Sequence, residues 1–164
     1  MFDLARFREA QDRRPGFADA LAELRAGAKT GHWIWYVFPQ LRGLGRSPMA
    51  ERYGLDGLEE AAAYLDDPVL AERLAAATAA VRAHVATPEH QARLARVMGS
   101  EIDALKLVSC LTLFSHVSRA AQARRPRPAL AALTDDAEAI LAAAGKQGYD
   151  RCAFTESRIT AARV

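Results

Sequence analysis

The sequence predicts an all-α fold, a compact multihelical single domain arranged around buried central helices. Alanine and leucine are abundant and β-branched residues are sparse, so intrinsic preference favours helix over most of the chain. Apolar residues also recur at the spacing of one helix face, as in Phe17, Ala20, Leu21 and Leu24. The chain of 164 residues has the length of one domain. We therefore expect a single helical domain over residues 1–164, with its last helices at about 129–164.

Several positions predict where helices begin and end. Ser47 before Pro48 combines an N-cap with a proline at the first helical position, and Asp67 before Pro68 repeats this pattern. Thr87 before Pro88 is a third example, and we expect the helix that it opens to end at Gly99.

The most informative predicted helix runs from Ile102 to Val117. Ser100 and Asp103 resemble a capping box at its start. Apolar side chains occupy nearly every side of this helix, and such a helix is normally central and buried.

The segment from residue 31 to 40 carries both tryptophans of the chain. Its six consecutive apolar residues fit neither the period of a helix nor that of a strand. Local preference alone is compatible with a buried strand.

Composition excludes several classes of function. The net charge of +2, from 22 basic and 20 acidic residues, is far from the concentrated positive field that nucleic-acid binding needs. Only residues 119–128 are locally basic, and we interpret them as a solvated, proline-broken connection between helices; the alternative is a contact with an anion or with RNA. No segment approaches the roughly 20 apolar residues of a membrane span, and the N-terminus does not resemble a signal peptide. We expect a cytoplasmic protein without membrane or nucleic-acid partners; the sequence does not indicate a protein partner.

Common motifs for metals, cofactors and nucleophilic catalysis are absent. The four histidines lack metal-ligand spacing, and no Walker loop, dinucleotide fingerprint or G-x-S-x-G elbow occurs. Cys110 and Cys152 form no C-x-x-C pair and are interpreted as reduced thiols. We expect neither a metal nor a cofactor.

Two groups of polar residues are candidates for a site. On the apolar helix, Lys106, Ser109 and Thr112 need partners because an unpaired buried polar group costs about 1–3 kcal/mol, and Asp103 lies one turn from Lys106. The alternative is that the hydroxyl groups bond to carbonyls of their own helix and that Asp103 and Lys106 form a surface pair.

The second group of candidates combines aromatic rings, an amide and a guanidinium, which suits the binding of a planar anion. It contains His32, Trp33, Trp35, Gln40, Arg46 and Ser47. The alternative for this group is an aromatic core.

These two groups are also where the chain resembles a small, all-helical bacterial and fungal family of unknown function, sometimes labelled calpastatin-like. The resemblance covers about residues 4–115. It depends most on His32-Trp33-x-Trp35-x-x-Phe38-Pro39-Gln40, on Gly43-Leu44-Gly45-x-Ser47, and on Asp103-x-Leu105-Lys106-Leu107 through Thr112-Leu113-Phe114. It implies that residues 32–40 are helical, and we adopt this over the strand. The chain departs from the family pattern at Val108 and Cys110, where arginine and serine are expected.

We hypothesise that the two groups form one pocket for a nucleotide or an ADP-ribose-like anion, with hydrolysis of an N-glycosidic bond as its reaction. Helical N-glycosidases are an analogy for this reaction only. Trp33 or Trp35 would stack on the ring, Arg46 and Lys106 would pair with phosphate, and Asp103 would be the catalytic residue. The alternative is a non-catalytic protein-interaction module without a small-molecule site.

Overall fold

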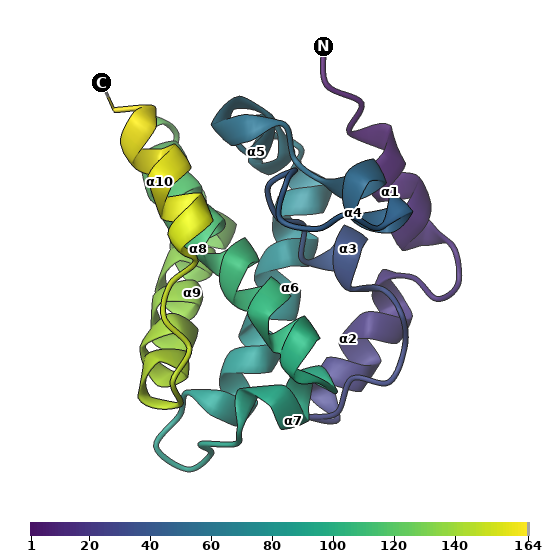
Figure 1. Ribbon diagram of the computed structural model, residues 1–164, viewed down its shortest axis with the longest axis vertical. Coiled ribbons are helices and arrows are strands. Elements are labelled where there is room, and N and C mark those ends of the chain that lie inside the picture. Colours follow the sequence, from purple (N-terminus) through teal and green to yellow (C-terminus); the bar gives the residue numbers. More distant parts are fainter. Residues whose placement is uncertain (164) are drawn as a thin grey trace.

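The computed structural model describes residues 1–163, and within them all regular structure is helical (Figure 1). The all-α prediction is therefore confirmed. The elements are α1 (Ala5–Asp12), α2 (Phe17–Arg25), α3 (Ile34–Val37), α4 (Pro48–Tyr53), α5 (Gly57–Asp66), α6 (Pro68–Val85), α7 (Leu94–Met98), α8 (Glu101–Arg124), α9 (Pro128–Lys146) and α10 (Ala153–Ala161).

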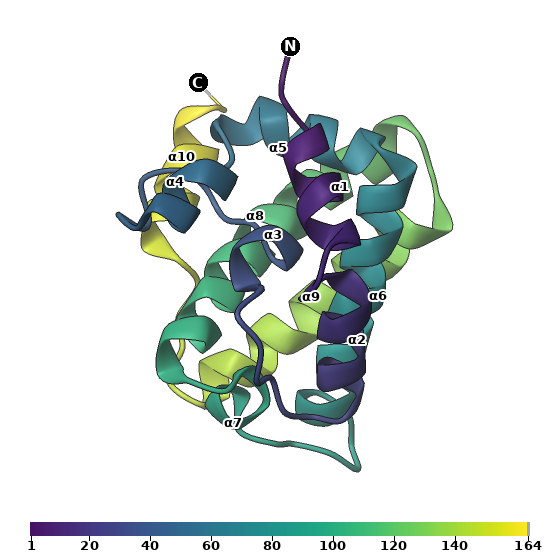
Figure 2. The ribbon, with the colours of Figure 1, turned by 90° about the vertical axis from the view of Figure 1, so that its right-hand side faces the viewer.

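The three longest helices, α6, α8 and α9, form the centre of the fold. Helix α9 packs against both α8 and α6. It runs antiparallel to α8, where the hydroxyl oxygens of Ser118 and Thr134 lie 2.7 Å apart. The shorter helices α1 to α4 lie together on one side of α6 and α8, and α10 lies along α8 on the other side (Figures 1 and 2).

Side-chain caps form where the sequence predicts them. The Ser47 hydroxyl accepts from the backbone N–H of Ala50, and the Asp67 carboxylate accepts from the first turn of α6. Ser100 accepts from the backbone N–H of Asp103 at 3.0 Å. These bonds satisfy N–H groups that a helix start leaves free, so the helices begin where they were expected to begin.

The helix expected to open at Thr87 and Pro88 does not form there. Thr87 instead closes a turn: its hydroxyl accepts from the backbone N–H of His90, and its own backbone N–H donates to the His90 carbonyl. Helix α7 begins only at Leu94. Gly99 does end it, with a left-handed φ of +82°.

Helix α8 differs from its prediction at both ends. It continues through Arg124, so most of the basic segment is helical rather than a connection. One face of its first turns is not buried: Ile102 is 66% exposed and Leu105 is 54% exposed, whereas Ala104 between them is buried. From Leu107 to Val117 nearly all of its side chains are buried, as expected for a central helix.

The helix expected over residues 32–40 is wrong for most of this segment: only α3 forms, a single helical turn flanked by irregular backbone. Beyond it, Leu41 and Leu55 form an isolated parallel bridge through the hydrogen bonds from Leu55 N to Gln40 O and from Arg42 N to Leu55 O, both 2.9 Å. This bridge fixes the chain on both sides of α4.

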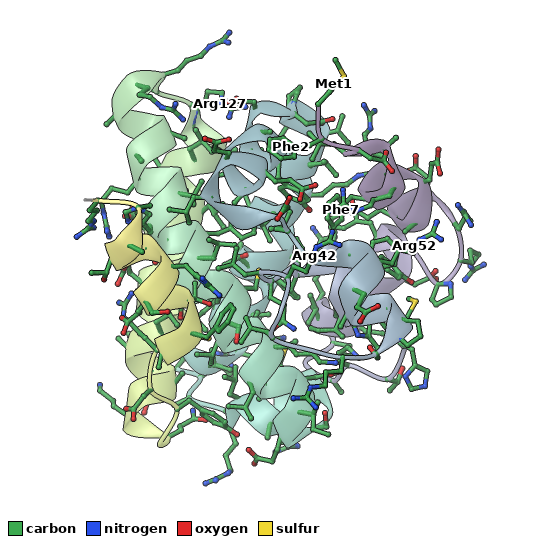
Figure 3. All side chains as sticks on the ribbon, turned by 45° about the horizontal axis from the view of Figure 1, so that its top comes forward. Met1, Phe2, Phe7, Arg42, Arg52 and Arg127 are labelled. Carbon is green, nitrogen blue, oxygen red and sulfur yellow. The ribbon has the colours of Figure 1, made fainter. Side chains whose placement is uncertain are left out.

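The N-terminal helix is joined to the same region by a buried ion pair. The guanidinium of Arg6 lies 2.7 Å from the Glu60 carboxylate and donates to the carbonyl oxygens of Arg52 and Gly54. The ring of Phe7 packs against Tyr53 and Tyr64 at centroid distances of 5.9 and 5.1 Å. Figure 3 labels Phe7 and Arg52 on this side of the molecule.

Candidate functional site

Two hollows share Ile34 and Trp35 and are together called the cleft; they bring together side chains from α3, from the loop that precedes it and from the start of α8. The outer part of the cleft has a volume of about 270 Å³. The residues that line it are Lys29, Thr30, His32, Ile34 and Trp35 from the first segment, and Met98, Gly99, Ser100, Ile102 and Asp103 from the second. Its inner part, of about 10 Å³, is lined by residues that include Trp35, Gln40, Tyr53 and Lys106. Ile34 and Trp35 line both parts, so Trp35 is the centre of the candidate site.

The Trp35 ring has two unusual features. Its indole nitrogen Nε1 is buried and has no hydrogen-bond partner among the described residues. The ammonium nitrogen of Lys106 lies 4.9 Å from the centre of its ring. Within residues 1–163, no carboxylate lies within ion-pair distance of Lys106. At Trp35, the described part of the protein therefore leaves one buried donor without an acceptor and one nearby cation without an acidic partner.

Trp33 occupies the opposite kind of environment. It is 0% exposed, and its indole nitrogen donates to the Glu23 carboxylate at 3.1 Å. The ammonium nitrogen of Lys29 covers its ring at 4.8 Å. Trp33 therefore belongs to the core in this structure, and its buried ring cannot stack on a ligand in this conformation. Of the two tryptophans proposed for stacking, only Trp35 lines the cleft.

Asp103 lines the outer cavity, and Lys29 holds it there. The two side chains form an ion pair of 2.6 Å, in which the Lys29 side chain is 5% exposed and the Asp103 side chain 17%. Lys29 also donates to the Gly31 carbonyl. Because a buried ammonium needs a close acid, this pair fixes both the loop before α3 and the catalytic candidate.

Glu23 organises the same loop from the other side. Its carboxylate accepts from the backbone N–H groups of Thr30 and Gly31 as well as from Trp33. Burial by itself would raise the pKa of Glu23, but these hydrogen bonds outweigh it and lower the pKa below its ordinary value. The loop that carries Lys29 is therefore built on an ionised carboxylate.

The remaining candidates do not all reach the cleft. His32 is exposed and lines the outer cavity, whereas Gln40 lines the inner one. Arg46 and Ser47 are exposed at the start of α4, and the Ser47 hydroxyl is engaged as the cap of that helix. Neither of these two residues lines the cleft.

The two hydroxyl candidates on α8 bond to carbonyl groups of their own helix, which was the alternative to a role in a pocket. Ser109 donates to the Leu105 carbonyl at 3.0 Å and Thr112 to the Val108 carbonyl at 2.7 Å. The Thr112 oxygen also accepts from the backbone N–H of Cys152, so Thr112 faces α10. Asp103 pairs with Lys29 rather than with Lys106, and the second alternative, a surface pair of these two, does not form.

Sequence reasoning missed Lys29 and Glu23. The signal that was available is the rarity of lysine: only three of the 22 basic residues are lysines, at positions 29, 106 and 146. Two of the three lysines lie over tryptophan rings.

Within residues 1–163, His, Cys, Asp and Glu do not gather in groups of three that could hold a metal. No helix in this part of the chain is long and apolar enough to cross a membrane.

The fold and the cleft together define a small all-α protein with a candidate site built around one tryptophan. The chain belongs to the DUF1810 family, described as proteins of unknown function, whose model matches residues 1–137. This confirms the resemblance inferred from the sequence and extends it beyond residues 4–115.

A solved structure is similar to this chain. It is the conserved hypothetical protein Rv1873 from Mycobacterium tuberculosis, with 45% identity over 80% of this chain and 84% of that one, and with a TM-score of 0.64. No curated protein matches the sequence.

Proposed function

We propose that this protein binds a small anionic molecule with a planar ring, such as a nucleotide or an ADP-ribose-like compound, in the cleft around Trp35. The observation that carries the proposal is the buried Trp35 nitrogen without a hydrogen-bond partner among the described residues. A buried donor left unpaired costs about 1–3 kcal/mol, so native proteins retain few of them. A ligand that supplies an acceptor removes this cost.

The charge next to this donor supports an anionic ligand. Lys106 lies over the Trp35 ring and has no carboxylate partner among residues 1–163. An oxygen of a phosphate or carboxylate group at this position would accept from the indole N–H and pair with the ammonium. The apolar side chains of Ile34 and Met98 in the outer cavity suit the ring of such a ligand.

The catalytic part of the proposal is hydrolysis of an N-glycosidic bond with Asp103 as the catalytic residue. Asp103 would orient a water molecule, accept one of its protons and stabilise positive charge on the sugar carbon. The water oxygen forms a bond to that carbon, while the carbon–nitrogen bond breaks with its electron pair going to nitrogen. The proton taken by Asp103 then passes to the leaving nitrogen.

The binding proposal is tested by a thermal-shift screen against nucleotides, ADP-ribose, NAD and riboflavin-pathway intermediates. A ligand at 100 times its dissociation constant adds about 2.7 kcal/mol to the free energy of unfolding. We expect the shift to be lost in Trp35→Phe, which removes the N–H and keeps an aromatic ring, and to be reduced in Lys106→Met.

Trp33→Phe provides the matched control. It removes a nitrogen that Glu23 already satisfies, so we expect it to lower stability and yet to retain the ligand-induced shift. A flat screen, or a shift that survives in Trp35→Phe, would contradict the proposal.

A second candidate function is a non-catalytic protein-interaction module. The observation in its favour is the exposure of Ile102 and Leu105, which lie one turn apart at the start of α8. Large apolar side chains that are exposed together often mark a contact surface. This candidate predicts that replacing both with serine abolishes binding to a protein partner while Trp35→Phe leaves it intact.

A further inference from the structure

The end of α8 that is remote from Trp35 borders a second hollow. Its volume is about 600 Å³, and it is lined by Asp66, Pro68, Ala121, Arg124, Arg125, Arg127 and Leu130. Lys106 and Arg124 are 18 positions apart on one helix, which corresponds to roughly 27 Å along its axis. This hollow is therefore separate from the cleft discussed above.

Three arginines line this hollow without acidic partners. Within residues 1–163, no carboxylate lies within ion-pair distance of Arg124, Arg125 or Arg127, although Asp66 borders the same hollow. Arginines elsewhere in the chain, such as Arg6 and Arg82, do pair with acids. Other arginines, such as Arg93 and Arg96, also lack an acid within ion-pair distance among the described residues; what distinguishes the α8–α9 turn is that three such arginines line one hollow.

The backbone of this turn holds the arginines in fixed positions. Arg125 and Arg127 each precede a proline, and both adopt extended backbone, with φ of −145°. The Gln122 side-chain oxygen accepts from the backbone N–H of Arg127 at 2.8 Å. The Arg127 guanidinium donates to the Leu65 carbonyl at the end of α5. Figure 3 shows Arg127 where the α8–α9 turn meets this part of the molecule.

The helix dipoles of α8 and α9 favour an arginine at only one of the two helix ends that meet in this turn. Arg124 lies in the last turn of α8, where a cation is favourable. Arg127, however, is the N-cap of α9, and the first turn of α9 contains no acid. A cation at a helix N-terminus is unfavourable. A bound anion would relieve this repulsion.

We propose that this hollow binds a small molecule carrying a multiply charged phosphate group, of the size of a diphosphate or larger. Guanidinium groups bind phosphate oxygens in pairs, and prolines that fix the turn lower the entropy cost of binding. Buried Ala121 and Leu130 line the hollow with apolar surface. A volume of about 600 Å³ lies in the range of small-molecule sites. The site is independent of the function proposed for the Trp35 cleft.

The test is titration calorimetry with inorganic pyrophosphate at low salt. We expect one site per chain, and at least a tenfold weaker affinity in Arg124→Gln/Arg125→Gln. Both side chains are exposed and donate no hydrogen bond within the described residues, so this variant should fold. Arg93→Gln/Arg96→Gln, with the same change of charge on the exposed side of α7, should weaken binding less than twofold.

Three results would overturn the proposal. The first is no heat of binding at millimolar pyrophosphate, and the second is equal weakening in both double variants, which would reflect net charge only. The third is preference for single-stranded RNA over pyrophosphate, with a salt dependence steeper than three phosphate contacts produce. Trp35→Phe should leave pyrophosphate binding unchanged, so failure at one site is distinguishable from failure at the other.

Discussion

The Lys29 ammonium and the Asp103 carboxylate form an ion pair of 2.6 Å that joins the loop before α3 to the first turn of α8. The two residues are far apart in sequence, and both line the outer cavity of the cleft. The shape of that cavity therefore depends on this pair.

Breaking the pair by removing one partner leaves the other charge buried and uncompensated. We expect Lys29→Met and Asp103→Leu each to lower the free energy of unfolding by about 3 kcal/mol. The double variant Lys29→Met/Asp103→Leu should lose no more than half of the summed losses of the two single variants, because two apolar side chains can replace a buried ion pair. Urea unfolding of the four proteins measures the coupling. Strictly additive losses would show that the pair does not act as a unit.

Glu23 predicts a pH dependence of stability. Its pKa in the folded protein is below the ordinary value of 4.5, so its contribution is present above about pH 4.5 and is lost as the pH falls through the folded pKa. The stability difference between the wild type and Glu23→Gln should be largest at neutral pH and should shrink in acid. Urea unfolding at a series of pH values tests this, and a difference independent of pH would contradict it.

Gly99 is required by both conformation and space. Its φ is +82°, and a Cβ atom there would lie 2.5 Å from the Lys29 carbonyl oxygen. We expect Gly99→Ala to cost about 2 kcal/mol or more.

Gly145→Ala is the matched control for this substitution. Gly145 lies in the last turn of α9, and a Cβ there would meet no atom of another part of the described chain within 4 Å. We expect a gain of about 0.5–1 kcal/mol, because alanine favours helix. Thermal unfolding of both variants compares their stability changes, and equal changes for Gly99→Ala and Gly145→Ala would exclude a special requirement for glycine at position 99.

The catalytic role proposed for Asp103 is tested with Asp103→Asn, which keeps a hydrogen-bond acceptor for Lys29 and removes the charge. We expect hydrolysis of the ligand found in the screen to fall at least 100-fold, while its dissociation constant changes less than threefold. Circular dichroism must first show that the variant is folded. Full turnover in the folded variant would exclude this role.

That residues 1–164 form a single domain stays a prediction. It requires helix content and tryptophan fluorescence to change together in urea, because both tryptophans lie in the N-terminal half and α9 and α10 in the C-terminal half. Two separate transitions would divide the chain into independent units.

The sequence predicted the helical class and several helix starts, because these depend on local properties. Ser47, Asp67 and Ser100 cap helices through residues two or three positions away. The error at Thr87 has a local cause as well, since its hydroxyl is equally able to close a turn with His90. Residues 31–40 were ambiguous because only one turn of them is helical.

The candidate site was predictable in part. The sequence identified His32, Trp35, Gln40, Asp103 and Lys106, all of which line the cleft. It did not distinguish Trp33 from Trp35, because their difference lies in partners distant in the sequence: Glu23 satisfies one indole nitrogen, and the other has no partner among the described residues.

The sequence by itself determined the class of the fold, the family and the main residue types of the site, since composition, capping and motifs are properties of neighbouring residues. Only the tertiary structure decided which tryptophan lines the cleft, which acid pairs with which lysine, and where three arginines line one hollow. These outcomes depend on burial and on contacts between α3, α8 and the loops beside them. No local pattern specifies such contacts, because they arise only when the helices pack.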